Sequence, residues 1–283
     1  MEKIQHAIEK ARAARASAEA NTPATAAPAA ASAGSPVAEA ATSAPDSPVA
    51  WGALAPYKPD AARLRALRVV TLAGGADAVA FDMMRTKVIQ QMRANGWRRL
   101  AITSPSPACG KSTIALNLAF SLARQREQRT VLAELDLRRP TLARMLSIQD
   151  RPAFAQVLEG RSDFADAALC YEGGLALAVN EGMVRNPAEL LHSTSVTTAL
   201  AAIEARYAPD MMLFDMPPML ISDDVMAFMT HVDAVLLIAA AETSTVKEID
   251  LCERELATQT NVMGVVLNKC HFMGKEYGYS YYG

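Results

Sequence analysis

A glycine–lysine–serine step lies within the run Cys109-Gly-Lys-Ser-Thr113, and these residue types at this spacing suit the binding of nucleotide phosphates. The run follows an apolar segment that predicts a strand, and it opens a segment that predicts a helix. The first N–H groups of a helix are unpaired and its dipole favours an anion. We therefore expect Lys111 to reach the β- and γ-phosphates of ATP and the Ser112 hydroxyl to bind Mg²⁺. Pro105 replaces the first glycine of the strict motif, and a plain strand-to-helix turn built on Gly110 is the alternative.

Carboxylates stand at the ends of two later apolar runs. The first run leads into Glu134-Leu-Asp136, and the second leads into Asp215. Mg²⁺ prefers oxygen ligands, and an attacking hydroxyl needs a nearby carboxylate to orient it and take its proton. Because the C-terminal ends of parallel strands meet at one edge of a sheet, we expect these carboxylates to lie beside Lys111. The chemistry that such a set supports is phosphoryl transfer.

The last seven residues contain four of the chain's seven tyrosines, with glycine and serine between them. Chain ends fray, and spacers of this kind provide no core against which a ring can bury its apolar surface. An ATP site and a cluster of exposed phenols on one chain predict a kinase that phosphorylates its own tail. The expected autophosphorylation sites are Tyr277, Tyr279, Tyr281 and Tyr282.

Continuous apolar runs with helical segments between them predict the elements that must position these residues. Runs of this kind are typical of a parallel sheet covered on both faces, and they predict a doubly wound, mostly parallel α/β fold. In such a fold the ligand lies beyond the C-terminal ends of the strands. We expect strands at 99–103, 131–135, 175–179, 211–214, 234–238 and 262–267, and helices at 77–95, 112–125, 186–206 and 246–257, with Val79, Met83, Val88 and Met92 as core positions.

Composition divides the chain into four parts. Residues 1–16 carry apolar residues at helical spacing and predict a short N-terminal helix. Residues 17–60 are dominated by alanine, proline, serine and threonine, with few large apolar side chains to offset the entropy of folding, so we expect a disordered linker. The ATP-binding kinase domain is expected at 61–272 and the tyrosine-rich tail at 273–283.

The overall composition is that of a globular protein without a strong charge. Its formal charge of −2 gives no net attraction to nucleic acid or anionic lipid. The four cysteines lack the paired spacing of a zinc site or a disulfide framework. No apolar run approaches the length of about 18 residues that indicates a membrane-spanning helix, and the N-terminus lacks the apolar core of a signal peptide. We therefore expect a cytoplasmic protein that binds no nucleic acid.

Three segments resemble the nucleotide-binding motifs of the bacterial tyrosine kinases of exopolysaccharide and capsule synthesis. They are Thr103–Thr113, Val131–Pro140 and Leu213–Pro218, and they occur in the family's order. Asn186–Leu191 and the tyrosine-rich end complete the similarity, which spans roughly residues 77–283. Each motif alone also occurs in ATPases that position division or partition machinery, so the combination carries the resemblance. It implies a P-loop NTPase domain of the MinD/ParA type.

The resemblance implies a tyrosine autokinase that requires ATP and Mg²⁺ and regulates exopolysaccharide synthesis or export. Family members without a membrane segment are switched on by a membrane adaptor of the polysaccharide co-polymerase type, which implies recruitment to the inner face of the membrane. Self-association is expected, because a short tail reaches a neighbouring copy more readily than its own loop. The implied catalytic residues are Lys111, Glu134, Asp136 and Asp215, with Glu134 near the attacking phenol. The implied metal ligands are Ser112, Asp136 and Asp215. The implied nucleotide-binding residues are Ala108, Cys109, Gly110, Lys111, Ser112, Thr113 and, at the adenine base, Asn268.

The chain departs from the family pattern in three places. Glu134 stands where the family has aspartate, and the helix motif E-x2-R-x2-R retains only its last arginine, Arg85. Ser106 occupies the position of the extra lysine that marks partition-type ATPases, and this difference favours a kinase. Two alternatives stay open, namely a partition-type ATPase switch without kinase activity and a regulator that has lost catalysis.

Overall fold

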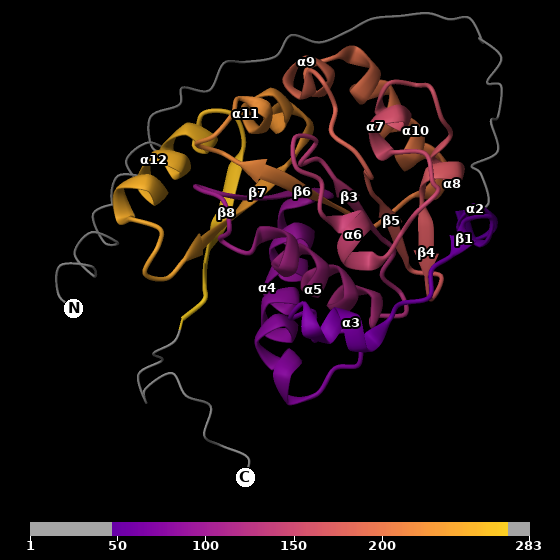
Figure 1. Ribbon diagram of the computed structural model, residues 1–283, viewed down its shortest axis with the longest axis horizontal. Coiled ribbons are helices and arrows are strands. Elements are labelled where there is room, and N and C mark those ends of the chain that lie inside the picture. Colours follow the sequence, from indigo (N-terminus) through magenta and orange to yellow (C-terminus); the bar gives the residue numbers. More distant parts are fainter. Residues whose placement is uncertain (1–46, 271–283) are drawn as a thin grey trace, which may run out of the picture. The chain divides into compact units, whose positions relative to one another are not determined.

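The structure is a computed structural model that describes residues 47–270, and its centre is a sheet of eight strands (Figure 1). The strands follow the spatial order β1-β4-β5-β3-β6-β2-β7-β8, and every neighbouring pair is parallel except β4 and β5. The predicted mostly parallel sheet is therefore confirmed. The strands are β1 (Ala55–Pro56), β2 (Arg99–Ser104), β3 (Thr130–Glu134), β4 (Leu169–Tyr171), β5 (Leu175–Ala178), β6 (Met211–Pro218), β7 (Ala234–Ala240) and β8 (Asn261–Asn268).

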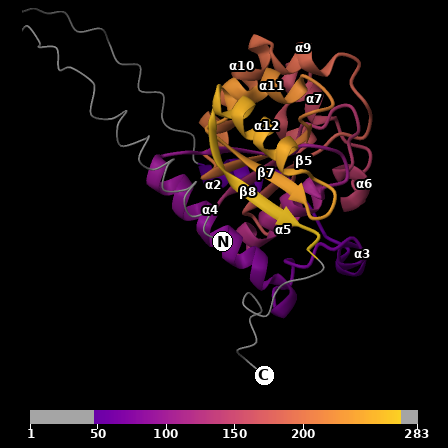
Figure 2. The ribbon, with the colours of Figure 1, turned by 90° about the vertical axis from the view of Figure 1, so that its left-hand side faces the viewer.

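Helices cover both faces of this sheet, as a doubly wound fold requires (Figure 2). No helix in the described part of the chain is both long and apolar enough to cross a membrane. One face is covered by α3 (Ala61–Ala66), α4 (Val79–Asn95), α5 (Lys111–Ala123) and α6 (Leu142–Leu146). The other face is covered by α2 (Ser47–Gly52), α7 (Phe154–Leu158), α8 (Phe164–Ala167), α9 (Pro187–Leu191), α10 (Thr194–Tyr207), α11 (Asp224–Phe228) and α12 (Val246–Ala257), and short 3₁₀ turns lie at Ala76–Ala78 and Met229–His231.

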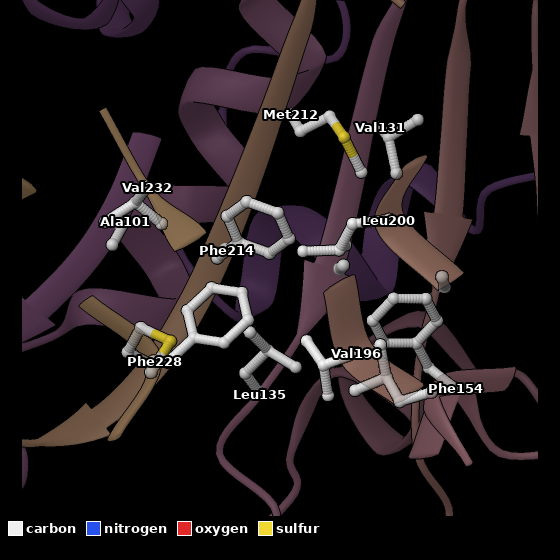
Figure 3. Packing of buried hydrophobic residues seen from close by; sticks show 14 of the residues in the cluster. Ala101, Val131, Leu135, Phe154, Val196, Leu200, Met212, Phe214, Phe228 and Val232 are labelled. Atoms are coloured by element: carbon white, nitrogen blue, oxygen red, sulfur yellow. The ribbon is translucent and has the colours of Figure 1, made fainter. Parts of the chain in front are cut away.

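Successive residues of the central strands face opposite sides and build two separate cores. Ala101 on β2 joins the core under α10 and α11, whereas its neighbours Leu100 and Ile102 join the core under α4 and α5. Figure 3 shows the first core, in which Phe214 on β6 packs edge-to-face on Phe228 with ring centroids 4.9 Å apart. Both faces of the strands are therefore buried, which explains why their sequences are continuously apolar.

Local signals set the ends of the longer helices. Thr245 caps α12 by accepting a hydrogen bond from the Glu248 backbone N–H, and the Glu248 side chain accepts one from the Thr245 N–H in return. At the C-terminal end of α4, Gly96 adopts the left-handed conformation, with φ of 68°, and the helix stops there. These end signals place both helices close to the predicted ranges 77–95 and 246–257.

The expected linker boundary at residue 60 is wrong, because residues 47–60 are folded against the domain. Trp51 is 3% exposed, and its indole N–H donates a 2.7 Å hydrogen bond to the Tyr207 carbonyl oxygen. Tyr57 is also buried, and its hydroxyl donates to the Leu146 carbonyl oxygen. The aromatic rings concentrated in this segment bury enough apolar surface to order it. The predicted N-terminal helix at 1–16, the rest of the linker and the tail tyrosines lie outside the described residues.

Two predictions about helices are corrected. Val88 and Met92 are buried as expected, but Val79 and Met83 are 47% and 38% exposed and lie outside the core. The single helix predicted at 186–206 is two helices, α9 and α10, which meet at an extended Ser193. Apolar spacing alone does not reveal either feature, because it marks a face of a helix without showing what covers that face.

Candidate active site

The loop between β2 and α5 has the geometry of a phosphate-binding loop. Gly110 precedes α5 with φ of +94°, a left-handed conformation that favours glycine. A Cβ atom at this position would collide with the side-chain amide of Asn268. The Ser104 hydroxyl donates a 2.8 Å hydrogen bond to the Ser106 carbonyl oxygen inside the loop. The loop therefore presents the N-terminus of a 13-residue helix at the C-terminal edge of the sheet.

Lys111 lies between two carboxylates at this edge. Its Nζ is 2.8 Å from Oδ2 of Asp136 and 3.8 Å from Oδ1 of Asp215. The same ammonium group donates to the Ser112 hydroxyl at 3.4 Å. Burial by itself would lower the pKa of Lys111, but the two carboxylates outweigh it and hold the pKa above its usual value. The lysine is therefore a buried cation with negative charge on two sides.

Asp215 lies within β6, opposite Glu134 at the end of β3, and is fully buried. No described residue donates a hydrogen bond to either of its carboxylate oxygens within normal limits. Burial raises the pKa of Asp215, while the charge of Lys111 and the nearby Ser112 hydroxyl oppose that rise. Buried oxygens without partners are costly unless something else satisfies them. A hydrated divalent cation would do so, and this observation fits a magnesium site.

The donor set around Asp215 suits Mg²⁺ better than a metal that needs a complete protein cage. Residues 47–270 contain no group of three or more His, Cys, Asp or Glu side chains that could hold a metal ion. Mg²⁺ commonly keeps several waters and takes one or two protein oxygens together with substrate phosphates. Ser112, Asp136 and Asp215 would supply those protein oxygens here.

Asp136 lies in the loop after β3, and its two carboxylate oxygens have different partners. Oδ1 accepts a 3.1 Å hydrogen bond from the Arg139 backbone N–H, and Oδ2 pairs with Lys111. The Asp136 side chain is 8% exposed, at the edge where the phosphates would lie. Its position fits both a metal-linked role and contact with an incoming hydroxyl.

Glu134 at the end of β3 has no exposed surface. Its Oε1 accepts hydrogen bonds from the backbone N–H groups of Thr141 at 2.5 Å and Leu142 at 2.7 Å, and its Oε2 accepts one from Asn180 at 2.9 Å. Burial raises its pKa to about 7, although these three hydrogen bonds act in the opposite direction. The side chain points into the protein.

Asn268 at the end of β8 reaches back to the phosphate loop. Its Nδ2 donates a 2.8 Å hydrogen bond to the Cys109 carbonyl oxygen. The Cys109 thiol itself is buried within 3.6 Å of the Ser106 and Ser244 hydroxyls. Burial would raise the pKa of this thiol, but the hydrogen bonds from Ser244 and Ser106 hold it below its usual value. Asn268 therefore braces the loop, and its contact with the adenine base stays a prediction.

The structure also brings Arg138, Thr141 and Asn180 to this edge, and the sequence did not single out the last two for the site. Arg138 forms a bidentate ion pair with the buried Asp224, at 2.6 and 2.9 Å, which joins the loop after β3 to the first residue of α11. The Thr141 hydroxyl is 3.5 Å from that of Ser112, and Asn180 bonds to Glu134. Each of these residues follows a strand closely, which is the signal that could have identified them.

Most of the predicted site residues lie together. Lys111, Ser112, Asp136 and Asp215 meet at the C-terminal ends of β3 and β6, with Glu134 behind them. The other loop positions, from Ala108 to Thr113, line the same turn, and Ala108 also has a positive φ of 61°. The four tail tyrosines lie outside the described residues.

Comparisons with known proteins identify relatives of this domain. A family model described as "ParA: NUBPL iron-transfer P-loop NTPase" matches residues 97–282. Tyrosine-protein kinase YwqD of Bacillus subtilis (strain 168) is 30% identical over 188 residues, which cover 66% of this chain and 78% of that protein. Tyrosine-protein kinase ptk of Acinetobacter johnsonii is 28% identical over 187 residues, which cover 65% of this chain and 25% of that protein.

A solved structure gives the same result for the fold. The kinase domain of the Escherichia coli tyrosine kinase ETK superposes with a TM-score of 0.62 at 26% sequence identity, covering 72% of this chain and 80% of that domain. The matched part of this chain thus spans most of the shorter relative but only about a quarter of the longer one, at 78% and 25% of their lengths. The matched region of the family model contains the phosphate loop and all three site carboxylates.

Proposed function

This chain belongs to the bacterial tyrosine kinases within the ParA-like P-loop NTPases, and from that premise we propose that it is an ATP-dependent autokinase whose substrates are its own tail tyrosines. The observation that supports the proposal most directly is the meeting of Lys111 with Asp136 and Asp215 beside the phosphate loop. The proposed acceptors are the phenols of Tyr277, Tyr279, Tyr281 and Tyr282.

Each residue at the site has a role that its position supports. Lys111 and the first N–H groups of α5 would hold the terminal phosphates, since a buried cation and a helix N-terminus both favour anions. Ser112, Asp136 and Asp215 would hold Mg²⁺, which when bound neutralises charge on the transferred phosphoryl group. Asn268 would fix the loop at the nucleotide side through the Cys109 carbonyl oxygen.

The proposal extends to regulation and partners. We propose that the chain acts in exopolysaccharide or capsule synthesis, with a membrane adaptor of the polysaccharide co-polymerase type that recruits it from the cytoplasm. Each phosphorylated tyrosine adds about −1.5 to −2 charges at neutral pH, so a fully modified tail would gain roughly six to eight negative charges. That charge would repel the tail from an acidic metal site. We therefore expect phosphorylation to loosen self-association.

Mass spectrometry of the C-terminal peptide tests the kinase activity. After incubation of the full chain with Mg·ATP, we expect phosphate on the tail tyrosines, and we expect Lys111→Met to abolish it. Variants in which all four tail tyrosines are replaced by phenylalanine should bind nucleotide normally but acquire no tail phosphate. Phosphate release without any tail modification would instead indicate the partition-type ATPase switch.

A further inference from the structure

Glu134 is bound on every side by the protein backbone. Its two carboxylate oxygens accept three N–H hydrogen bonds, two from the entrance of α6 at Thr141 and Leu142 and one from Asn180 after β5. The side chain has no exposed surface. A group in this environment is well placed to hold segments together, but it is poorly placed to meet a phenol from solvent.

Two partners of Glu134, Asn180 and Thr141, make further contacts that connect it to other segments. The Asn180 side chain donates a 2.9 Å hydrogen bond to the Glu134 carbonyl oxygen and accepts another from the Ala155 N–H at the start of α7. On the other side, the hydroxyl of Thr141 is 3.5 Å from the hydroxyl of Ser112 in the phosphate loop. Glu134 therefore links the ends of β3 and β5 with the loop that would bind the metal.

We propose that Glu134 is a positioning residue that holds Thr141 against Ser112 and does not accept the phenol proton. This assignment rests on the proposed kinase function. It differs from the role that the family resemblance implied for position 134.

The hydrogen-bond partners separate the two carboxylates. Moving Glu134 toward a substrate would break all three of its backbone hydrogen bonds. Oδ2 of Asp136 has a single mobile partner, the Lys111 ammonium at 2.8 Å. When Lys111 turns to a phosphate, this oxygen becomes free for a metal ion, whereas the oxygens of Glu134 stay bound to the backbone.

The chemical step balances without a proton transfer to Glu134. The phenol oxygen forms a bond to the γ-phosphorus of ATP as the bond from that phosphorus to the bridging oxygen breaks, and ADP leaves with that electron pair. The phenol proton passes to solvent water. Glu134 takes no part in the transfer and keeps its backbone hydrogen bonds throughout.

Two substitutions at position 134 separate positioning from proton transfer, because the two roles predict opposite results. Glutamine has the shape of glutamate and keeps an oxygen for Thr141 and Leu142, although its NH₂ group replaces the oxygen that accepts from the Asn180 N–H, and it cannot act as a base. Aspartate is a base, but it is shorter by one methylene and cannot span from β3 to the entrance of α6. If Glu134 acts by positioning, activity depends on the length of the side chain at position 134. If Glu134 acts as a base, activity depends on a carboxylate at that position.

The experiment measures initial rates of tail phosphorylation by full-length wild type, Glu134→Gln, Glu134→Asp and Asp136→Asn at varied ATP and Mg²⁺. We expect Glu134→Gln to keep kcat within about tenfold of wild type, and Asp136→Asn to lose roughly 10²-fold or more. Glu134→Asp should need several-fold more Mg²⁺ for half-maximal rate. A loss of roughly 10²-fold in kcat for Glu134→Gln, with Glu134→Asp close to wild type, would overturn the assignment.

Thr141→Ala keeps the proposal testable if the Glu134 variants do not fold, which thermal unfolding would reveal. The substitution retains the backbone N–H that Glu134 accepts and removes only the hydroxyl beside Ser112. We expect a several-fold rise in the Mg²⁺ concentration needed to support ATP binding, and an unchanged requirement would refute the link. Because this binding is measured without tail phosphorylation, it stays informative even if wild type shows no kinase activity.

Discussion

The ammonium group of Lys111 and the carboxylate of Asp136 form a 2.8 Å ion pair in which both side chains are largely buried. Asp215 lies on the other side of the same ammonium group. Any phosphate that binds Lys111 must therefore compete with carboxylates of the protein itself. Mg²⁺ can ease this competition, because a cation near Asp136 and Asp215 replaces the lysine as their counter-charge.

Asp215→Asn should affect the stability of the protein and its binding of Mg²⁺ in different ways. The native carboxylate is fully buried and no described residue donates a normal hydrogen bond to it, so neutralising it removes a costly charge. We expect the unfolding temperature to be equal to or higher than that of wild type. The extra thermal stabilisation that Mg²⁺ gives to the nucleotide complex should be lost. The exposed Asp250→Asn provides the matched control, and a variant that still responds to Mg²⁺ would contradict the metal role of Asp215.

Glu134 should make the stability of the domain depend on pH. Its pKa is about 7 in the folded protein against a usual value of 4.5, so the folded state holds this proton more tightly between those pH values. The contribution of Glu134 to stability therefore falls as the pH rises from 4.5 to 7 and is level above that range. The unfolding free energy of Glu134→Gln relative to wild type should rise across this window, by up to about 3 kcal/mol.

Denaturant unfolding at a series of pH values measures that difference. The exposed Glu253→Gln is the matched control, since it removes a glutamate from the surface of α12 without touching the site. A difference between Glu134→Gln and wild type that stays constant from pH 4.5 to 7 would show that burial does not shift this carboxyl group as described.

The strands and the phosphate loop were accessible from the sequence because their signals are local. A continuous apolar run such as 234–238 reports burial on both faces, and the loop residues follow directly from the glycine–lysine–serine step at Gly110. Because the C-terminal ends of parallel strands meet at one edge of a sheet, the sequence alone predicts that Asp136 and Asp215 lie beside Lys111.

The role of Glu134 could not be read in the same way. Its partners Thr141 and Asn180 are 7 and 46 positions away, and nothing in their residue types shows that backbone N–H groups would point at this carboxylate. The folding of residues 47–60 was missed for a related reason. The stretch as a whole is dominated by small and polar residues, so its composition does not show that Trp51 and Tyr57 are buried. Their hydrogen-bond partners lie 156 and 89 positions away.

Arg138 and Asp224 should contribute to stability as a pair. Asp224 is fully buried, and Arg138 binds both of its oxygens. Arg138→Ala leaves this carboxylate with only the Ser222 hydroxyl, so we expect a loss of about 2–3 kcal/mol in unfolding free energy. Arg138→Ala combined with Asp224→Asn should recover part of the loss. Arg139→Ala is the control, and an equal loss there would show that the ion pair is not the cause.

Asn268→Ala tests whether this side chain braces the phosphate loop or recognises the adenine base. Its amide donates to the Cys109 carbonyl oxygen, so removal should loosen the loop and weaken nucleotide binding about fivefold, the equivalent of one hydrogen bond of about 1 kcal/mol. If bracing is the main role, calorimetric titration should show similar losses for ATP and GTP. A loss confined to ATP would identify a contact with the base instead.

Asn261→Ala is the matched control, because Asn261 lies at the opposite end of the same strand and donates an equivalent 2.8 Å hydrogen bond to the Asp233 carbonyl oxygen. That substitution removes the same type of bond far from the loop. It should lower stability without changing the affinity for either nucleotide. An equal loss of nucleotide binding in both variants would mean that β8 as a whole, and not the Asn268 amide, sets the shape of the loop.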